Sequence, residues 1–325
     1  MSSKNGHTIL VKQLLTDPRV DPTSEQNFAL RMSIQNGHFE IVEMLLQDPR
    51  VGSSIGNGGM FPVHPTCSKV IKILLNDPRI LPYLNLNYIM SFNFDCEILK
   101  KLLSLGVDPS ENTLYTLCKH GNSEGVELLL KSPKINLHAY SYEPIKLACE
   151  HGHLNVVKLL FKNSKTNINE LLKISSESGQ LEIVKLLLEY ETNDPTVNNN
   201  YCVRWASANG HTEVVKLLLM DPRVNPADNH NFAIKYSSCH NRISVVKLLL
   251  QDTRVDPSDD NNYAIRKASY FGNVEVVRML LQDNRVDPTV NENEPIRWAI
   301  KKKRTEVVEL LLKDERVNQK LQSKS

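Results

Sequence analysis

Apolar residues recur along the chain in short helical stripes that alternate with polar turns. Residues 212–219 read Thr-Glu-Val-Val-Lys-Leu-Leu-Leu, with apolar side chains at five positions that wrap around much of a helix. Such a stripe is wider than one neighbour can cover, and it is expected when a helix is packed on both sides. A shorter helix precedes it, with Val203, Ala206 and Ser207 facing inward and Asn200 as its predicted cap. Gly210 ends that first helix, so the pattern predicts two helices joined by a tight turn.

The helix pair repeats along the chain. The turn position recurs every 31 residues at Gly210, Asn241, Gly272 and Lys303. Upstream it falls at Gly6, Gly37, Gly121, Gly152 and Gly179. The interval of 84 residues between Gly37 and Gly121 leaves room for two degenerate units, which makes about eleven units in all.

We expect residues 1–325 to form a single array with three parts. Residues 1–51 hold two units, the first incomplete because Met1 aligns with Trp205. Residues 52–110 hold two degenerate units, with a glycine-rich break at 52–59 that is predicted to remove the first helix of the third unit. Residues 111–325 hold seven units, the last of which is predicted to be a polar cap.

The repeat resembles the ankyrin repeat. Glu143-Pro144-Ile145-Lys146 and Glu294-Pro295-Ile296-Arg297 stand at the family's Thr-Pro-Leu-His position, and Leu102–Pro109 matches its Leu-Leu-x-x-Gly-Ala-Asp loop. The period of 31 residues is shorter than the usual 33, like the short repeats of amoebae and of the large DNA viruses that infect them. The resemblance implies an all-α helix–turn–helix solenoid with short finger loops. It also implies a non-enzymatic scaffold or adaptor that binds a partner protein through its concave first-helix and loop-tip surface.

Composition and charge are those of an ordinary globular chain. Lys and Arg total 39 and Asp and Glu total 37, so the net charge of +2 creates no field that would mark a nucleic-acid or membrane-surface protein. The six cysteines are far apart and form no Cys-x-x-Cys pair, which favours reduced, buried thiols over a zinc site or a disulfide scaffold. No signal peptide or membrane-spanning stretch is present. We therefore expect an intracellular, cytoplasmic and monomeric protein.

No catalytic, cofactor-binding or metal-binding motif occurs, so the sequence predicts no enzyme, no cofactor and no metal. His7, His38, His153 and His211 share the turn position, where an imidazole can hydrogen-bond the neighbouring loop; a metal site is the alternative. Cys118 and Cys149 share a first-helix position that serine holds in other units. That position favours close packing over a reactive thiol.

Two ladders of basic residues follow the repeat. The first-helix ladder lies six residues before each turn, and the loop ladder lies among acids in the Asp-Pro-Arg-Val-Asp-Pro loop. We expect both to be paired within the protein; the alternative is a nucleic-acid or polyanion binder that uses them. The first-helix ladder is Arg31, Lys146, Lys173, Arg204, Lys235, Arg266 and Arg297, and the loop ladder is Arg19, Arg50, Arg79, Lys134, Lys165, Arg223, Arg254, Arg285 and Arg316.

Partner-binding residues are expected at the two positions before each turn and at the loop tips, because in related repeats these positions contact partners. These positions vary between units, whereas second-helix positions such as Val214 and Leu218 barely change. The aromatic pair Tyr270-Phe271 is the sharpest candidate, with coverage of the next helix as its alternative. The candidates are Lys119, His120, Glu150, His151, Ala208, Asn209, Asn229, His230, Cys239, His240, Asp259, Asp260, Tyr270, Phe271, Lys301 and Lys302.

Four consecutive cations, Lys301, Lys302, Lys303 and Arg304, replace the turn glycine of the last unit. They are a candidate nuclear-import signal or anion-binding patch, which would allow a nuclear location. The alternative is a solvated polar cap.

Overall fold

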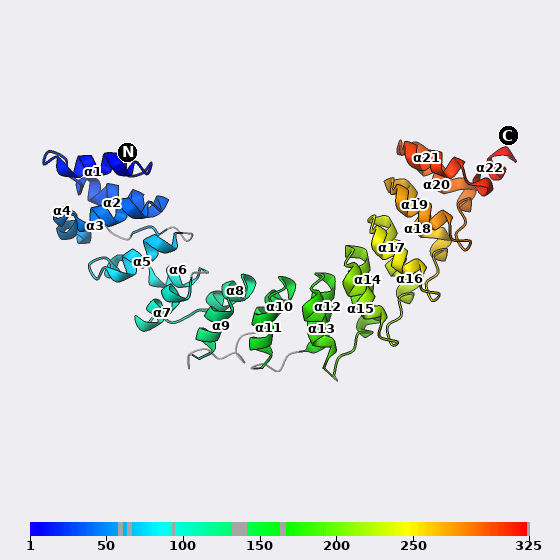
Figure 1. Cartoon of the computed structure of the whole chain (residues 1–325), viewed down its shortest axis with the longest axis horizontal. Helices are drawn as coiled ribbons and strands as arrows, with labels where there is room; N and C mark the ends of the chain where they lie inside the picture. The colour runs from blue at the N-terminus through cyan, green and yellow to red at the C-terminus, as the bar shows by residue number, and fades with distance from the viewer. Residues whose placement is uncertain are drawn as a thin grey trace. The chain divides into compact units, whose positions relative to one another are not determined.

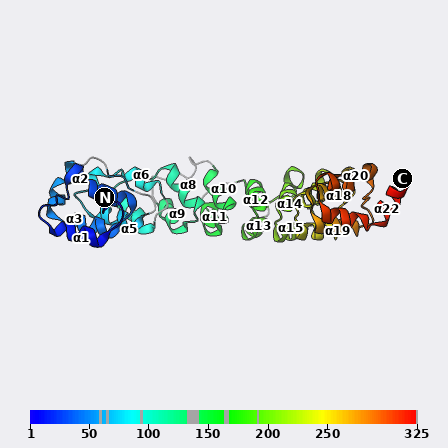
Figure 2. The ribbon, with the colours of Figure 1, turned by 90° about the horizontal axis from the view of Figure 1, so that it is seen from above.

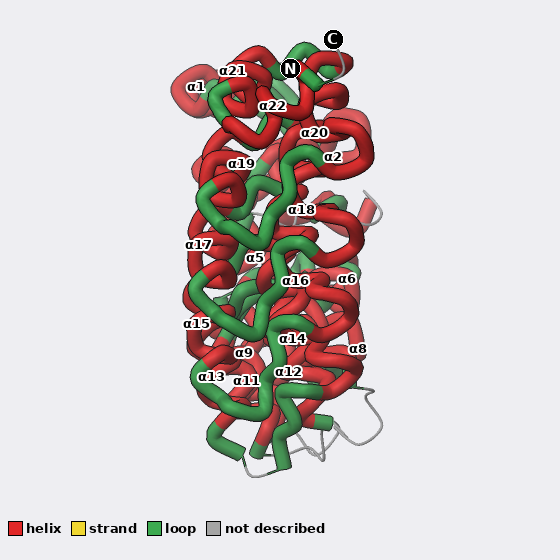
Figure 3. Tube along the Cα trace, turned by 90° about the vertical axis from the view of Figure 1, so that its right-hand side faces the viewer, coloured by secondary structure: helices red, strands yellow, loops and turns green. Residues whose placement is uncertain are grey.

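The computed structural model describes residues 1–57, 61–63, 67–92, 95–131, 142–162, 167–190 and 192–323. Every regular element in these ranges is helical, and the tube view contains helices and loops but no strand (Figure 3). The prediction of an all-α helix–turn–helix repeat is confirmed.

The second helices of the repeat are the most regular elements. They are amphipathic or apolar on both flanks, and most run for eight or nine residues before an Asp-Pro or a polar loop ends them. In the described part of the chain they are α1 (Thr8–Thr16), α3 (Phe39–Gln47), α5 (Ser68–Asn76), α7 (Cys96–Ser104), α9 (Ser123–Leu130), α11 (Leu154–Phe161), α13 (Leu181–Leu188), α15 (Thr212–Leu219), α17 (Ile243–Leu250), α19 (Val274–Leu281) and α21 (Thr305–Leu312).

The first helices vary more in length. They are α2 (Ser24–Asn36), α6 (Leu86–Met90), α8 (Glu111–Lys119), α10 (Glu143–Glu150), α12 (Ile168–Glu177), α14 (Val197–Asn209), α16 (Asp228–Cys239), α18 (Asp259–Phe271) and α20 (Val290–Lys301). The remaining helical segments are α4 (Pro49–Ser54), η1 (Ile55–Asn57), η2 (Leu81–Tyr83) and α22 (Glu315–Gln322).

The chain divides into two compact units, which are described separately. Unit 1 comprises Met1–Leu147 with Lys158–Ser164, and unit 2 comprises Ala148–Val157 with Lys165–Ser325. In unit 2, α14 packs between α12 and α16, while α15 packs between α13 and α17 (Figure 1). Seen from above, α12, α18 and α20 follow one side of this unit, and α13, α15 and α19 follow the other (Figure 2).

The core of each repeat is shared with the next repeat. In unit 2, for example, Val276, Val277 and Leu280 of α19 are fully buried together with Ile265 of α18 and Val307 of α21. This explains the wide apolar stripe, because one flank of α19 faces α17 and the other faces α21.

The first helices do not begin as predicted. Asn198, Asn199 and Asn200 all have positive φ, near 55°, so they form a left-handed turn before the helix proper. The prediction that Asn200 caps its own helix is wrong, because its side-chain oxygen accepts the Asn225 N–H of the following loop and its amide donates to Asp228. Residues 229–231, 260–262 and 291–293 repeat this turn, and asparagine suits it because its short polar side chain tolerates the left-handed region.

In the turns 198–200, 229–231 and 260–262, the last asparagine joins one repeat to the next. The buried Asn231 accepts a hydrogen bond at Oδ1 from the Asp256 backbone N–H (2.8 Å) and donates from Nδ2 to Asp259 Oδ2 (2.8 Å). Asn200 makes the same two contacts, with the Asn225 N–H and with Asp228. We call this recurring arrangement the asparagine clamp. It fixes the position of each loop against the preceding first helix.

The glycine-rich segment is partly helical. Gly52 lies in α4 and Gly56 lies in η1, whereas Gly58 and Gly59 fall outside the described residues. Residues 61–63, which align with the first helix that is predicted to be lost from the third unit, are not helical. The short helix α4 therefore occupies part of the predicted break, capped by Asp48, whose side chain accepts the Arg50 N–H.

A column of buried serines on the first helices gives a stability prediction. Ser238 is 0% exposed and its hydroxyl has no hydrogen-bond partner, whereas the neighbouring Ser237, also 0% exposed, donates to the Ile234 carbonyl. We expect Ser238→Ala to raise the free energy of unfolding by up to about 1 kcal/mol, and Ser237→Ala to lower it by about 1 kcal/mol. Urea denaturation measures the free energy of unfolding of both variants. An equal loss of stability in the two would contradict the difference in hydrogen bonding between Ser237 and Ser238.

Candidate interaction surface

The first-helix ladder is engaged within the protein, as expected. Arg204 donates from Nε to the Asn199 carbonyl (2.7 Å) and from Nη2 to the Asn198 carbonyl (2.9 Å). It thus closes the left-handed turn, whose carbonyls a right-handed helix would have satisfied by itself. Arg31, Arg266 and Arg297 bond the corresponding carbonyls, and Lys146, Lys173 and Lys235 pair with carboxylates.

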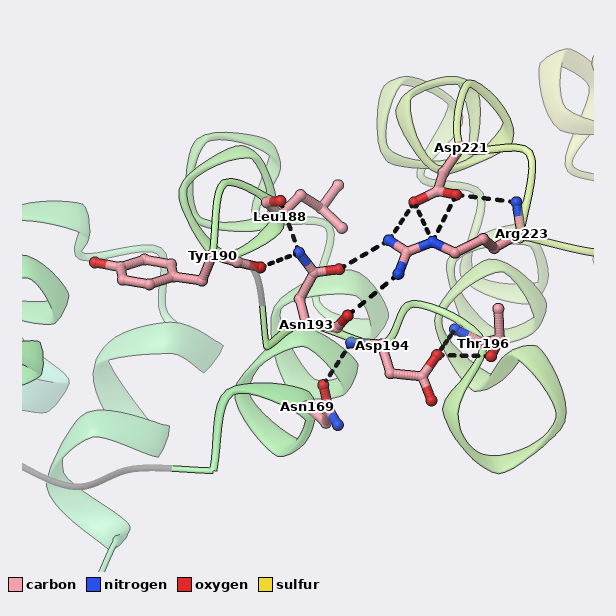
Figure 4. Close-up of polar contacts among 8 residues, drawn as sticks. All are labelled: Asn169, Leu188, Tyr190, Asn193, Asp194, Thr196, Asp221 and Arg223. Carbon is pink, nitrogen blue, oxygen red and sulfur yellow. Dashed lines mark hydrogen bonds and ion pairs between the residues drawn. The ribbon is translucent and has the colours of Figure 1, made fainter.

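The loop ladder is also paired with neighbouring groups. Arg223 binds Asp221 through two nitrogens and reaches back to the Asn193 carbonyl and side chain (Figure 4). Asn193 in turn donates to the Leu188 and Tyr190 carbonyls. Five further arginines of the loop ladder each pair with the aspartate two residues earlier and donate to a carbonyl of the preceding repeat. They are Arg50, Arg79, Arg254, Arg285 and Arg316. Arg19 pairs with Asp17. Lys134 and Lys165 lie outside the described residues.

These loop pairs make stability depend on pH. The arginine hydrogen bonds hold the pKa of Asp221, Asp252 and Asp283 below the usual aspartate value. Because the folded-state pKa is the lower one, the stabilisation is complete above the unfolded pKa of about 3.9 and is lost as pH falls through the folded pKa. We expect a constant melting temperature above about pH 5 and a decline below about pH 4. Thermal melts of wild type and of the double variant Asp252→Asn/Asp283→Asn test this. The melting temperature of the variant should be lower at neutral pH and should decline less below about pH 4. Parallel curves of melting temperature against pH would contradict the prediction.

The turn histidines act as braces between repeats. His38 Nε2 lies 2.9 Å from the Lys4 carbonyl oxygen, and His211 Nε2 lies 2.9 Å from the Glu177 carbonyl oxygen. Arg242 and Arg304 use the same position to donate to the Ala208 and Tyr270 carbonyls. The structural interpretation is confirmed for these two histidines. Among the described residues, no group of three or more His, Cys, Asp or Glu side chains is placed to hold a metal ion.

The cysteines lie in packing positions of differing depth. Cys118, Cys149 and Cys202 are buried, and burial raises the pKa of each thiol to about 12. These thiols are therefore protonated at neutral pH, which fits close packing rather than a reactive thiol. The expectation of buried thiols is wrong for Cys67, Cys96 and Cys239, which are only half-buried.

Four of the predicted loop-tip residues line one groove on the first-helix side of unit 2. Asn229 and His230 border it from the turn that begins α16, and Asp259 and Asp260 border it from the turn that begins α18. Its volume is about 490 Å³. The rest of its lining, Phe232, Lys235 and Tyr236, comes from α16. Lys235 crosses to Asp260 at 3.2 Å, so the groove carries a partly neutralised acidic edge beside two aromatic rings.

Aromatic rings follow the same side of unit 2 in a continuous row, and none of them is among the predicted partner-binding residues. The Trp205 ring centroid lies 5.8 Å from Tyr201 and 5.5 Å from Phe232. The row continues to Tyr236, stacked 4.1 Å from Phe232, and to Tyr263, 6.2 Å from Tyr236. Arg204 and Lys235 lie over these rings at 5.1 and 5.5 Å. We call these five rings with the two cations the aromatic strip.

The sequence does contain a signal for the strip. Aromatic residues recur nine residues before the turn, at Tyr201, Phe232 and Tyr263, and five residues before it, at Trp205, Tyr236 and Trp298. Residues four apart lie on one helix face, so the repeat places both columns on the same side.

A second cluster of aromatic and basic residues lies where α18 and α20 end. Tyr270 makes edge contacts with Phe271 (4.9 Å) and Trp298 (5.2 Å). Lys302 Nζ lies 4.6 Å from the Tyr270 ring and Lys301 Nζ 4.9 Å from the Trp298 ring. Hydrogen bonding from Lys302 lowers the pKa of Tyr270. We call Tyr270, Phe271, Trp298, Lys301, Lys302 and Arg304 the aromatic–lysine patch.

The other predicted partner residues differ in exposure. Lys119, His120, Glu150, His151 and His240 are exposed. Ala208 is a correction, because its side chain is only 1% exposed and cannot contact a partner. His240 and Arg242 both reach its carbonyl oxygen and hold the next repeat against it. Asn209 is half-buried and donates to the Glu177 carbonyl, so its amide serves the inter-repeat contact.

The family model described as "Ankyrin repeats (3 copies)" matches residues 86–170, 171–261 and 236–321. The chain belongs to the ankyrin-repeat family. An X-ray structure of an ankyrin repeat family protein from Legionella pneumophila is 18% identical, with 82% of this chain and 84% of that chain covered and a TM-score of 0.35. No curated protein matches the chain.

Ankyrin repeats are generally modules of protein–protein interaction, and proteins of the family are typically not enzymes. In this ankyrin-repeat chain, no helix within the described ranges has the length and apolar character needed to cross a membrane. The groove, the aromatic strip and the aromatic–lysine patch all lie in unit 2, on first helices α14 to α20 and the loops that precede them.

Proposed function

We propose that this chain is a non-enzymatic adaptor that binds a partner protein through the first-helix and loop-tip side of unit 2. The observation that carries the proposal is the aromatic strip with its adjoining groove. Tyr, Trp and Phe rings fixed by neighbours make good anchors, because little side-chain freedom remains to be lost on binding. The strip supplies five such rings on one side of three consecutive first helices.

Variation between repeats supports the same side. The two positions before the turn read Ala-Asn, Cys-His, Tyr-Phe and Lys-Lys in four successive repeats, whereas the second helices keep their Val and Leu residues. A scaffold that packs identically in each repeat but binds one particular partner requires this contrast. We place the adaptor inside the cell as a monomer, where its thiols remain reduced.

Nucleic-acid binding through the ladders is not favoured. The described ladder residues are held by carboxylates or carbonyl oxygens of the protein itself, so phosphate groups would have to displace those contacts. Surface cations that are already paired release few counterions on binding.

Affinity capture from whole-cell lysate tests the proposal. We expect wild type to retain a discrete protein at about 50 and at 200 mM salt, and His230→Ala/Phe271→Ala to lose it. Both residues are exposed, so the variant loses no core packing. Met220→Ala/Ile243→Ala, which removes two exposed apolar side chains elsewhere in unit 2, is the matched control. Loss of the protein with the control, or its retention by the first variant, would refute the proposed surface.

A further inference from the structure

We propose that the aromatic–lysine patch binds an acidic segment of the partner that also carries an apolar side chain. This inference rests on the proposed adaptor function and adds the chemistry of the segment that is recognised. The patch differs from the rest of the first-helix side in charge, exposure and pairing.

The positive charge of the patch is not neutralised by the protein. Lys301, Lys302 and Arg304 of the patch and the adjoining Lys303 are all exposed, and within the described part of the chain none of them is ion-paired with a carboxylate. Every arginine of the described loop ladder, by contrast, has an aspartate partner. Four adjacent unpaired cations create a local positive potential even though the whole chain is close to neutral.

The lysines are positioned rather than freely mobile. The Lys301 and Lys302 ammonium groups lie over the Trp298 and Tyr270 rings, which restricts the side chains while leaving the charges at the surface. Arg304 Nε donates to the Tyr270 carbonyl at 3.3 Å. Because part of the side-chain entropy is already lost, a carboxylate can pair with these groups at a lower entropic cost.

An apolar contact site adjoins the charges. The Phe271 side chain is 45% exposed at the end of α18, and its ring is held by the edge contact with Tyr270. An exposed ring beside unpaired cations complements a segment in which carboxylates flank an aromatic or large aliphatic residue.

A protein segment fits the patch better than a nucleic acid does. Sequence-tolerant binding of single strands requires free aromatic faces and a basic track that follows several phosphates. Here lysines occupy positions over the Trp298 and Tyr270 rings, and the unpaired cations are confined to four consecutive residues. The next helix, α21, presents exposed Glu306 and Glu309, which interrupt a positive track.

Selection from a phage-displayed library of random 12-residue peptides on the full chain tests the proposal. Counter-selection against Phe271→Ala/Lys301→Ala/Lys302→Ala removes peptides that bind elsewhere. We expect the remaining peptides to be rich in Asp and Glu around one aromatic or aliphatic residue. Neutral or basic consensus sequences, or no peptides that distinguish the two proteins, would overturn the proposal.

Fluorescence anisotropy with the best selected peptide then measures how much the lysines of the patch and the carboxylates of the peptide contribute to binding. We expect Lys301→Ala/Lys302→Ala, and a peptide with Gln in place of Glu, each to weaken binding about tenfold, while Lys301→Arg/Lys302→Arg retains it. Lys216→Ala/Lys247→Ala, which removes two exposed lysines of α15 and α17, should have no effect. Displacement of the peptide by a 12-nucleotide oligothymidine at lower concentration than by unlabelled peptide would overturn the proposal in favour of nucleic acid.

The two proposals fail in distinguishable ways. If the lysate protein depends on His230 and Phe271 but selection yields no acidic consensus, the chemistry assigned to the patch is wrong and the adaptor surface stands. If His230→Ala/Phe271→Ala still captures every protein that wild type captures, the adaptor surface is refuted as well.

Discussion

Gly179→Ala should lower the free energy of unfolding by about 2–5 kcal/mol. Gly179 has φ +76°, so any Cβ is strained, at about 1–2 kcal/mol. The added methyl would also lie far inside van der Waals contact with the His211 ring, which packs on this turn from the next repeat. Displacing that ring adds about 1–3 kcal/mol of overpacking and threatens the bond from His211 to the Glu177 carbonyl.

Gly106→Ala is the matched control, because φ is +78° there but nothing lies within 4 Å of the point that a Cβ would occupy. It should cost only the backbone strain, about 1–2 kcal/mol. Urea denaturation of Gly179→Ala, His211→Ala and the double variant isolates the contact, and we expect a coupling energy of about 1–3 kcal/mol. Equal losses in Gly106→Ala and Gly179→Ala would contradict the brace.

In unit 2, two repeats have a residue other than glycine at this turn position. Asn241 and Lys303 also have positive φ, so a side chain is tolerated at the turn when space allows. In several other repeats, a His or Arg lies 32 residues after the turn glycine and packs against it. The residue 32 positions after Asn241 is the shorter Asn273. At Asn241, the short side chain of the next repeat thus accompanies a turn that is not glycine.

Asn231→Ala should cost about 3–5 kcal/mol. The substitution removes two partly buried hydrogen bonds, one from the Asp256 N–H and one to the charged Asp259 carboxylate, worth about 2–3 kcal/mol together. Alanine is also strained at the left-handed φ of 51°. Asn293→Ala is the control, since Asn293 holds the same place, is 3% exposed and has an Oδ1 without a partner. It should cost about 1–2 kcal/mol, and a loss equal to that of Asn231→Ala would contradict the clamp.

Asn231→Asp separates the two halves of the clamp. The new carboxylate can still accept the Asp256 N–H, but it would stand opposite the Asp259 carboxylate in place of the 2.8 Å hydrogen bond. Two carboxylates at that distance cannot both ionise without cost, so the shared site takes up a proton more readily in the folded state. We expect the destabilisation relative to wild type to be largest at neutral pH and to shrink near pH 4. A pH-independent difference in melting temperature would contradict this.

The repeat and its helix pairs could be predicted because they depend on local periodicity. The Val-Val-x-x-Leu spacing of Val214, Val215 and Leu218 recurs in α11, α17, α19 and α21, and the same apolar spacing specifies a buried second helix each time. The loop arginines could be predicted for a similar reason, since each is two residues from its aspartate partner.

The left-handed turns could not be derived in the same way. Asn198–Asn200 is compatible both with a helix cap and with a left-handed turn, because asparagine suits each. The choice depends on contacts from elsewhere: Arg204 binds the turn carbonyls, and the Asn225 N–H of the following loop binds Asn200. The burial of Ala208 has the same origin, because His240 and Arg242 reach it from the next repeat.

Site-specific photo-crosslinking tests the central claim, the interaction side of unit 2, most directly. Benzoylphenylalanine would replace Phe271 in one protein and Met220, which is 77% exposed in the loop after α15, in another. Each purified protein is irradiated in whole-cell lysate and the adducts are identified. We predict that a discrete protein is crosslinked from position 271 and not from position 220. A partner crosslinked equally from position 220, or from position 220 alone, would contradict the assignment of the binding surface to the first-helix side.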